Sequence, residues 1–166
     1  MRGSTWLLVL GLLSMACGVP AGSFEPSGLA PPGGGLTLVT EPTATRGLTW
    51  SNLRADGEQL TVDLVATESL NDVYGLALRL HLTGATFVKA EAAEAWPLFR
   101  AERGALVFSA RGASAGRVVR GGRVATVWLS PSAAAGRIEL DLSRSALVGA
   151  DGASRQVSMG AARWSR

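Results

Sequence analysis

The chain has 166 residues, of which 47% are apolar and 17% are charged, which excludes a disordered chain and predicts a folded core. The formal net charge of +3 is too small to indicate nucleic acid as a partner. A single cysteine excludes an internal disulfide.

The first 16 residues are predicted to be a signal peptide. After a short positive start, residues 6–13 form an apolar segment that is too short to span a membrane. Residues 12–18 resemble the lipobox of bacterial lipoproteins, in which the cysteine, here Cys17, carries the lipid. Ser14 stands where that motif usually has leucine. We therefore expect an exported protein anchored by lipid to the cell envelope, with a secreted or periplasmic protein as the alternative.

Three further segments are predicted after the signal peptide. Residues 17–35 are rich in proline and glycine and are expected to be a flexible, lipid-anchored linker. The folded domain is expected over residues 36–159, and residues 160–166 are expected to be a C-terminal tail. No repeat period is visible within the domain, which argues against a propeller or a solenoid.

The domain shows the alternation of apolar and polar residues that is typical of strands with one buried face. We expect strands over residues 36–40, 47–53, 59–67, 72–82, 85–91, 104–110, 123–129, 136–142, 146–148 and 155–159. About eight to ten strands at this spacing predict an all-β fold, a single jelly-roll or Greek-key β-sandwich. One short helical turn is expected near 91–96, where helix formers precede Pro97.

The strand at residues 72–82 should fix the register of its sheet. Its apolar series runs from Tyr74 through Leu78 to Leu82, and the residues between are small or polar. A slip of one residue would expose the whole series. Leu78 is therefore predicted to face the core, and Arg79 to face away from it.

Two parts of the pattern resemble cohesin-type domains. One is residues 60–82, where Asn71-Asp-Val-Tyr-Gly75 leads into the long strand, and the other is residues 136–152, which end in Gly149-Ala-Asp-Gly152. The aspartate common in the turn of those domains is missing here, where residues 83–85 are Thr-Gly-Ala. The resemblance implies a jelly-roll sandwich related to carbohydrate-binding modules, and a non-catalytic binding role, since cohesins bind dockerin modules.

No catalytic residue, cofactor or metal site is expected, so the chain is predicted not to be an enzyme. Residues 112–116 match Gly-x-Ser-x-Gly, but no helix pattern follows, and the single histidine, His81, lies upstream. Calcium is a weaker alternative with Asp151 as the loop ligand, because no calcium-loop spacing is present. The other acidic residues considered are expected on solvent-facing strand positions: Asp63, Glu139 and Asp141.

Two features could bind a ligand. Trp96 precedes a proline in a predicted loop, so it is the best candidate for an exposed aromatic platform. Arg117, Arg120 and Arg123 belong to a basic segment that could grip an acidic partner. The sequence thus predicts a cell-surface module that binds a protein or a polysaccharide, and not nucleic acid. A structural envelope lipoprotein without a soluble ligand is the alternative.

Overall fold

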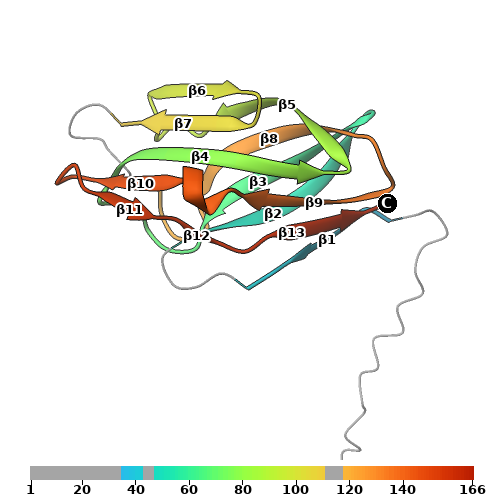
Figure 1. Ribbon diagram of the computed structural model, residues 1–166, viewed down its shortest axis with the longest axis horizontal. Coiled ribbons are helices and arrows are strands. Elements are labelled where there is room, and N and C mark those ends of the chain that lie inside the picture. The colour runs from blue at the N-terminus through green and yellow to red at the C-terminus, as the bar shows by residue number, and fades with distance from the viewer. Residues whose placement is uncertain (1–34, 43–46, 111–117) are drawn as a thin grey trace, which may run out of the picture. The chain divides into compact units, whose positions relative to one another are not determined.

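The computed structural model describes residues 35–42, 47–110 and 118–166. These belong to one compact unit, Pro31–Arg166, and residues 1–34 lie outside the described part. Within that part no helix is long and apolar enough to cross a membrane. The described residues form two β-sheets (Figure 1).

The larger sheet has eight strands and is built around β4. Its strands, in the order of pairing, are β1 (Thr37–Thr40), β13 (Ala162–Ser165), β9 (Ala135–Leu140), β4 (Val73–Thr83), β10 (Ala146–Gly149) and β11 (Ser154–Gln156). The hairpin of β6 (Leu98–Glu102) and β7 (Ala105–Ser109) adds to the opposite edge of β4 from β10. All of these neighbours are antiparallel.

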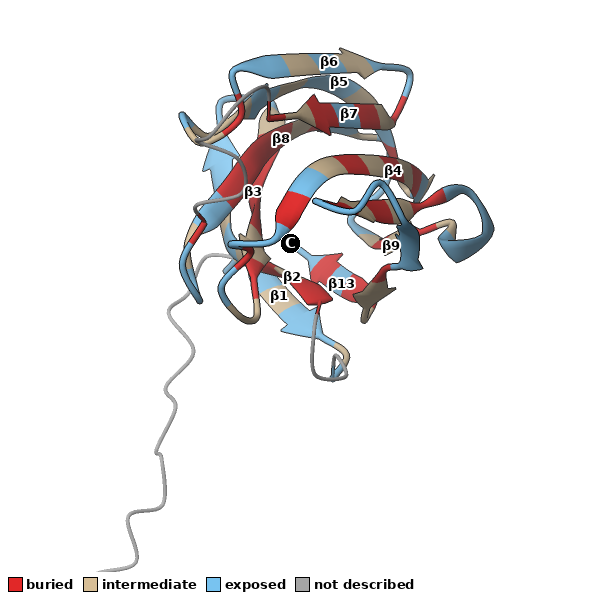
Figure 2. Cartoon of the chain, turned by 90° about the vertical axis from the view of Figure 1, so that its left-hand side faces the viewer, coloured by how far each residue is buried: buried red, intermediate tan, exposed pale blue. Residues whose placement is uncertain are grey.

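The smaller sheet has five strands and lies behind the larger one in Figure 1. In the order of pairing they are β12 (Ser158–Met159), β2 (Gly47–Asp56), β3 (Gln59–Ala66), β8 (Arg123–Pro131) and β5 (Ala85–Ala92). Only the pair β12–β2 is parallel. In Figure 2 buried stretches recur along β3, β4, β7, β8 and β13, which contribute to one shared core. The predicted all-β sandwich is confirmed.

The alternation predicted for β4 is confirmed from Leu76 onward. Leu78 is 2% exposed, whereas Arg79 is half-buried on the other face of the strand. Tyr74 departs from the pattern because it lies in a β-bulge. Val148 and Gly149 of β10 are consecutive, but they lie opposite Gly75 and Val73 of β4, so Tyr74 is the extra residue between them. Tyr74 is 37% exposed, and Val73, which is 4% exposed, takes the buried position that was predicted for Tyr74.

The helical turn expected near 91–96 is wrong. Pairing of β5 with β8 continues to Ala92, opposite Ala125, and the chain then turns with a hydrogen bond from the Trp96 N–H to the Ala93 carbonyl (3.0 Å). The ladder thus overrides the helix propensity of the alanines. Among the described residues the one helical element is a 3-10 turn, η1 (Leu142–Arg144). The strand count also exceeds the prediction, because several strands are short edge segments.

The segment expected as a C-terminal tail instead contains β13. Trp164 is 2% exposed and lies across Gly136 of β9, where a Cβ atom would come within 2.6 Å of the indole ring. The absence of a side chain at Gly136 therefore makes room for the indole. Burial of an aromatic ring of this size explains why so short a strand is held in the sheet.

Candidate functional site

The outer face of the larger sheet has a floor of small residues. On β4 the inward positions are leucines, and the outward positions next to them are Gly75 and Ala77. Gly75 lies opposite Ser109 of β7 and Val148 of β10. Because strands alternate their side chains, directly opposed residues lie on the same face. At the centre of this face the backbone of β4 is thus nearly bare.

Larger apolar side chains stand around this floor. Val107 of β7 lies opposite Ala77 and is 49% exposed, and Leu98 of β6 lies opposite Ser109 with the same exposed fraction. Val107 and Tyr74 border an open depression of about 460 Å³, and Leu98 lies beyond Ser109 at its edge. We call this the trough; its lining comprises Tyr74–Ala77, Val107–Ala110, Val148–Ala150 and Gly152.

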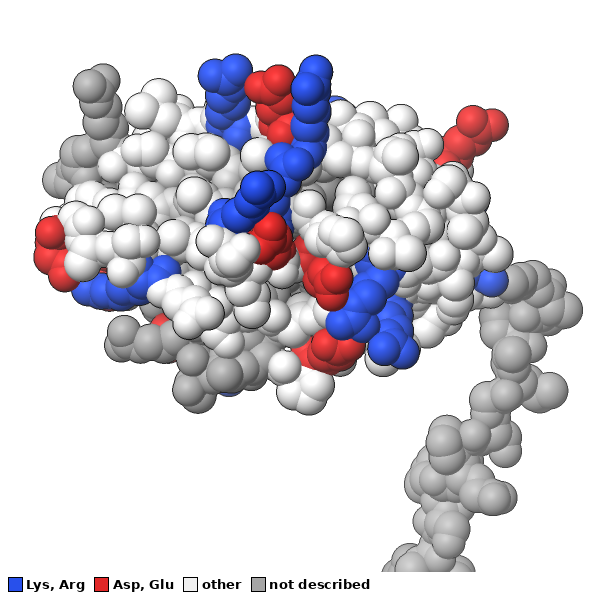
Figure 3. Space-filling view, viewed as in Figure 1, with Lys and Arg blue, Asp and Glu red and all other residues white. Residues whose placement is uncertain are grey.

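Charged residues begin where the trough ends. Arg79 lies two residues along β4 from Ala77. Its side chain forms no ion pair within the described part of the chain. Arg100 of β6, opposite Val107, is paired with Glu102 at 3.2 Å. Figure 3 shows a band of charged side chains across this face of the molecule and an uncharged area beside it. The face therefore divides into an apolar part and a charged part.

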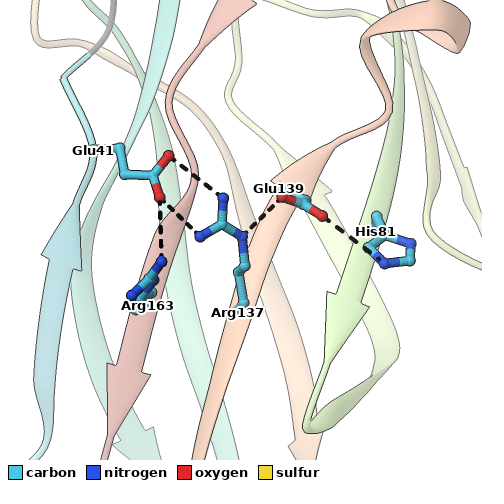
Figure 4. A network of polar contacts seen from close by, with 5 residues as sticks. All are labelled: Glu41, His81, Arg137, Glu139 and Arg163. Carbon is cyan, nitrogen blue, oxygen red and sulfur yellow. Dashed lines mark hydrogen bonds and ion pairs between the residues drawn. The ribbon is translucent and has the colours of Figure 1, made fainter.

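The charged part is an ordered network over β1, β13, β9 and β4 (Figure 4). Arg137 on β9 bridges two carboxylates at 2.8 Å each, those of Glu139 and of Glu41, which follows β1. His81 lies 3.9 Å from Glu139, and Arg163 lies 4.0 Å from Glu41. These groups are partly exposed, so each pair contributes little stability. Their fixed pattern of opposite charges can still orient a partner.

Trp96, the predicted aromatic platform, is not exposed. It is 3% exposed and meets Phe108 edge to face, with the ring centroids 5.5 Å apart. The turn after β5 folds the indole beneath the β6–β7 hairpin, so the prediction that the proline-linked loop would expose it is wrong. An aromatic ring in this position stabilises the core and cannot stack on a ligand.

The two predicted arginines that the structure describes, Arg120 and Arg123, do not lie in the trough. Arg120 and Arg123 are exposed, the first beside Ser69, whose Oγ accepts its N–H (3.3 Å), and the second at the start of β8. Arg117 and Cys17 lie outside the described residues, as does the Gly-x-Ser-x-Gly segment at 112–116. Ligand binding by the arginines and lipidation of Cys17 therefore stay predictions.

Asp63 is the acidic residue whose surroundings differ most from the prediction. It is on the outer face of β3, as the alternation requires, but it is only 5% exposed. Arg54 donates two hydrogen bonds of 3.1 Å to its carboxylate, Thr126 donates one of 2.7 Å, and Asn52 donates one of 3.1 Å. Burial opposes ionisation of Asp63, but these donors outweigh it and hold its pKa below the usual value.

The other candidate acids are also engaged by the protein. Asp151 accepts the N–H of Ala153 (3.0 Å) and pairs with Arg155 at 3.2 Å, and both contacts help to lower its pKa. Asp141 caps η1 by accepting the N–H of Ser143 (3.1 Å). Over residues 35–42, 47–110 and 118–166 no three acidic, histidine or cysteine residues gather as a metal site would require.

The residues of the trough were not singled out by sequence reasoning. The signal that could have found them is the pair Gly75 and Ala77, which place minimal side chains on the outer face of a strand whose inner residues on either side of them are leucines. Val107 is a second signal. The outward position between the buried residues Leu106 and Phe108 would usually carry a polar side chain, but here it carries an exposed valine.

Comparison with known proteins establishes the fold. No protein-family model and no curated protein matches the sequence. The third ScaB cohesin of R. flavefaciens, solved with a group 1 dockerin, superposes with a TM-score of 0.53 at 13% identity, over 72% of this chain and 97% of that one. The complex of CaDoc0917 with CaCohA2, the latter from Clostridium acetobutylicum, gives 0.50 at 9% identity, over 70% and 99%. The chain therefore has a cohesin-like β-sandwich fold.

Proposed function

We propose that this protein is a non-catalytic protein-binding module that works at the cell envelope, and that its partner binds in the trough. The observation that carries the proposal is the apolar surface around Gly75 and Ala77, bordered by Val107, which is 49% exposed, and Tyr74, which is 37% exposed. Exposed apolar surface gathered in one place marks interaction sites in soluble domains, whereas single exposed residues do not. Charged groups border it on one side, as at the polar rim of an interface.

The shape of the trough suits a helix. Its side walls stand on β7 and β10, the two neighbours of β4, so they are two strand spacings apart, or about 10 Å. A whole helix, about 10–12 Å across, would not sink between the walls, but the apolar side chains on one of its faces would fit between them while its axis lies above the sheet. An amphipathic helix aligned with β4 could place its apolar residues between Val107 and Val148.

The charged part of the same face would set the orientation of the partner. Arg79 lies at one end of the trough, and the network around Arg137 continues beyond it along β4 and β9. A partner with an acidic residue near Arg79 gains a charge-assisted contact only when it binds in one direction. The known structures with this fold include cohesins solved as complexes with dockerins, which supports protein binding as the role here.

The location at the envelope rests on the N-terminal sequence. A lipid on Cys17 followed by the linker of residues 17–35 would hold the domain near a membrane while leaving its faces accessible. A structural lipoprotein without a soluble ligand is the competing role, and the following experiment separates the two.

The test uses capture from an extract of the producing cell's envelope by the tagged full-length protein. Ala77→Arg fills the floor of the trough with a charged side chain, and Ala55→Arg makes the same change at an exposed position on β2. We expect wild type and Ala55→Arg to retain the same proteins and Ala77→Arg to lose them, with equal thermal stability. A photo-crosslinking residue at 107 should then label the captured partner. Identical capture by all three proteins would contradict the proposal, and so would capture of nothing by wild type.

A further inference from the structure

The outer face of the smaller sheet differs from the trough, because almost every outward side chain is polar. Hydrogen-bonding groups occupy neighbouring positions on four strands, and one large aromatic ring lies among them. The outward residues are Thr49, Ser51, Arg54 and Asp56 on β2, Thr61, Asp63 and Val65 on β3, Arg123, Thr126, Trp128 and Ser130 on β8, and Thr86, Lys89 and Glu91 on β5.

Trp128 lies flat against this face. Its strand, β8, is two strands from β2, yet its Nε1 is 3.4 Å from Oδ2 of Asp56 on β2. The indole therefore crosses β3, and this explains why Thr61, which is opposite Trp128 on β3, is only 5% exposed. The other tryptophans in the described part of the chain are buried, so Trp128 is the indole that this part offers to solvent.

The groups around the ring are held in place by one another. Arg54 is fixed by its two hydrogen bonds to Asp63, and Lys89 pairs with Glu91 at 2.7 Å. The Lys89 ammonium also lies 4.2 Å from the centroid of the Trp128 ring. Hydrogen-bond donors and acceptors thus surround the indole. Among them the three carboxylates Asp56, Asp63 and Glu91 outnumber the two cations, Arg54 and Lys89. An acidic ligand finds no net attraction at such a site.

We infer that this face binds a neutral saccharide by stacking a pyranose ring on Trp128. A pyranose with equatorial hydroxyls presents an apolar face of axial C–H groups, which matches an indole that lies parallel to a flat sheet. Its hydroxyls act both as donors and as acceptors, as do the groups that border the ring. Lys89, whose side chain is 53% exposed, would leave the ring and donate to a hydroxyl.

This site is independent of the trough. Trp128 is on the smaller sheet and Val107 on the larger one, each on the side that faces away from the shared core. A saccharide at Trp128 and a protein at the trough would therefore not compete for the same surface. The module would then link a glycan to a protein partner.

The test is titration calorimetry on the full-length protein with two soluble probes, the β-1,4-linked hexasaccharides of glucose and of galactose. They differ only in the configuration at the fourth carbon of each ring, where galactose carries its oxygen axially, and this breaks up one apolar face. We expect the glucose probe to bind at least about tenfold more tightly than the galactose probe. Trp128→Ala should weaken binding of the glucose probe by at least about tenfold.

Two matched variants separate stacking from folding. Trp128→Phe keeps a ring and should retain binding, and Val107→Ala changes only the trough and should bind the glucose probe like wild type. No heat with wild type at millimolar probe would overturn the inference. Equal affinity of Trp128→Ala and wild type, or equal affinity for the two probes, would also overturn it. None of these results bears on capture through Ala77, so the protein-binding proposal can fail or hold by itself.

Discussion

The two outer faces of this sandwich are both formed by strands with one buried side, but their outward side chains differ in size and polarity. On the larger sheet Gly75 and Ala77 leave the backbone of β4 uncovered. The neighbouring apolar side chain of Val107 points away from the core and is not buried by it. On the smaller sheet Asp63 and Trp128 lie close to the sheet and are fixed by hydrogen bonds across strands. Side chains of the smaller sheet thus cover much of their own backbone and leave Trp128 as the partly exposed ring, whereas no large side chain on β4 covers its backbone at Gly75 and Ala77.

The largest effect on stability should come from a substitution in the core between the two sheets. Leu78→Ala removes a side chain that is 2% exposed, and we expect it to lower the free energy of unfolding by about 2–5 kcal/mol. Arg79→Ala, one position along and on the outer face, should change it by no more than about 0.5 kcal/mol. Urea unfolding of both variants measures this. Equal losses would mean that β4 is buried on both sides.

The next effect concerns the polar face. Asp63→Ala should cost about 2 kcal/mol, because Arg54 and Thr126 lose an ionised, mostly buried acceptor. Asp56→Ala, an exposed carboxylate on the same face, should cost no more than about 0.5 kcal/mol. Urea unfolding at pH 7 compares the two, and similar losses would show that the hydrogen bonds to Asp63 add nothing specific.

The same carboxylate predicts a pH dependence. The pKa of Asp63 is lowered in the folded protein, so its contribution is present above the unfolded value of about 3.9 and is lost as the pH falls through the folded pKa. The stability difference between wild type and Asp63→Asn should therefore shrink in acid below about pH 4. A difference that stays constant from pH 7 to pH 2 would contradict this.

The trough should show almost no effect on stability. Val107→Ser replaces a half-exposed apolar side chain, and we expect a change within about 0.5 kcal/mol together with weaker capture of the partner. Phe108, the next residue, is 1% exposed, and Phe108→Ala should cost about 3–5 kcal/mol. A large loss of stability in Val107→Ser would mean that the apolar wall belongs to the fold.

Cys17→Ser should leave the stability of the domain unchanged, because the predicted lipid attaches outside residues 36–166. It should abolish partitioning of the processed protein into detergent. Partitioning of the serine variant like wild type would show that the protein is not anchored through this cysteine.

One-sided burial is what made much of the fold predictable. β4 beyond Leu76 and β9 toward Leu140 alternate because each has one face on the core, and the period of two is visible without any tertiary contact. β6 and β13 were missed for the opposite reason. β6 follows a stretch of helix formers that the ladder of β5 keeps extended, and β13 depends on Trp164 fitting over Gly136, which is distant in sequence.

The site was harder to predict than the fold, because exposure depends on what neighbouring strands place over a residue. Alternation put Asp63 on the correct face, but it could not show that Arg54 and Trp128 would cover that face. Trp96 beside a proline indicated an exposed loop, yet a short turn carries it under Phe108. The trough exists because Gly75 and Ala77 have little or no side chain, and a search for patterns of large apolar residues does not detect such positions.

The pairing of β1 with β13 has a consequence for protein engineering. Thr37 lies directly opposite Ser165, so the two ends of the folded part are neighbours at one edge of the larger sheet. A short linker could therefore join residue 166 to residue 36, and the chain could be reopened at the exposed turn around Gly57. Such a circular permutant would free β1 from the N-terminal tether and carry new termini at the β2–β3 turn, on the smaller sheet, without touching the trough.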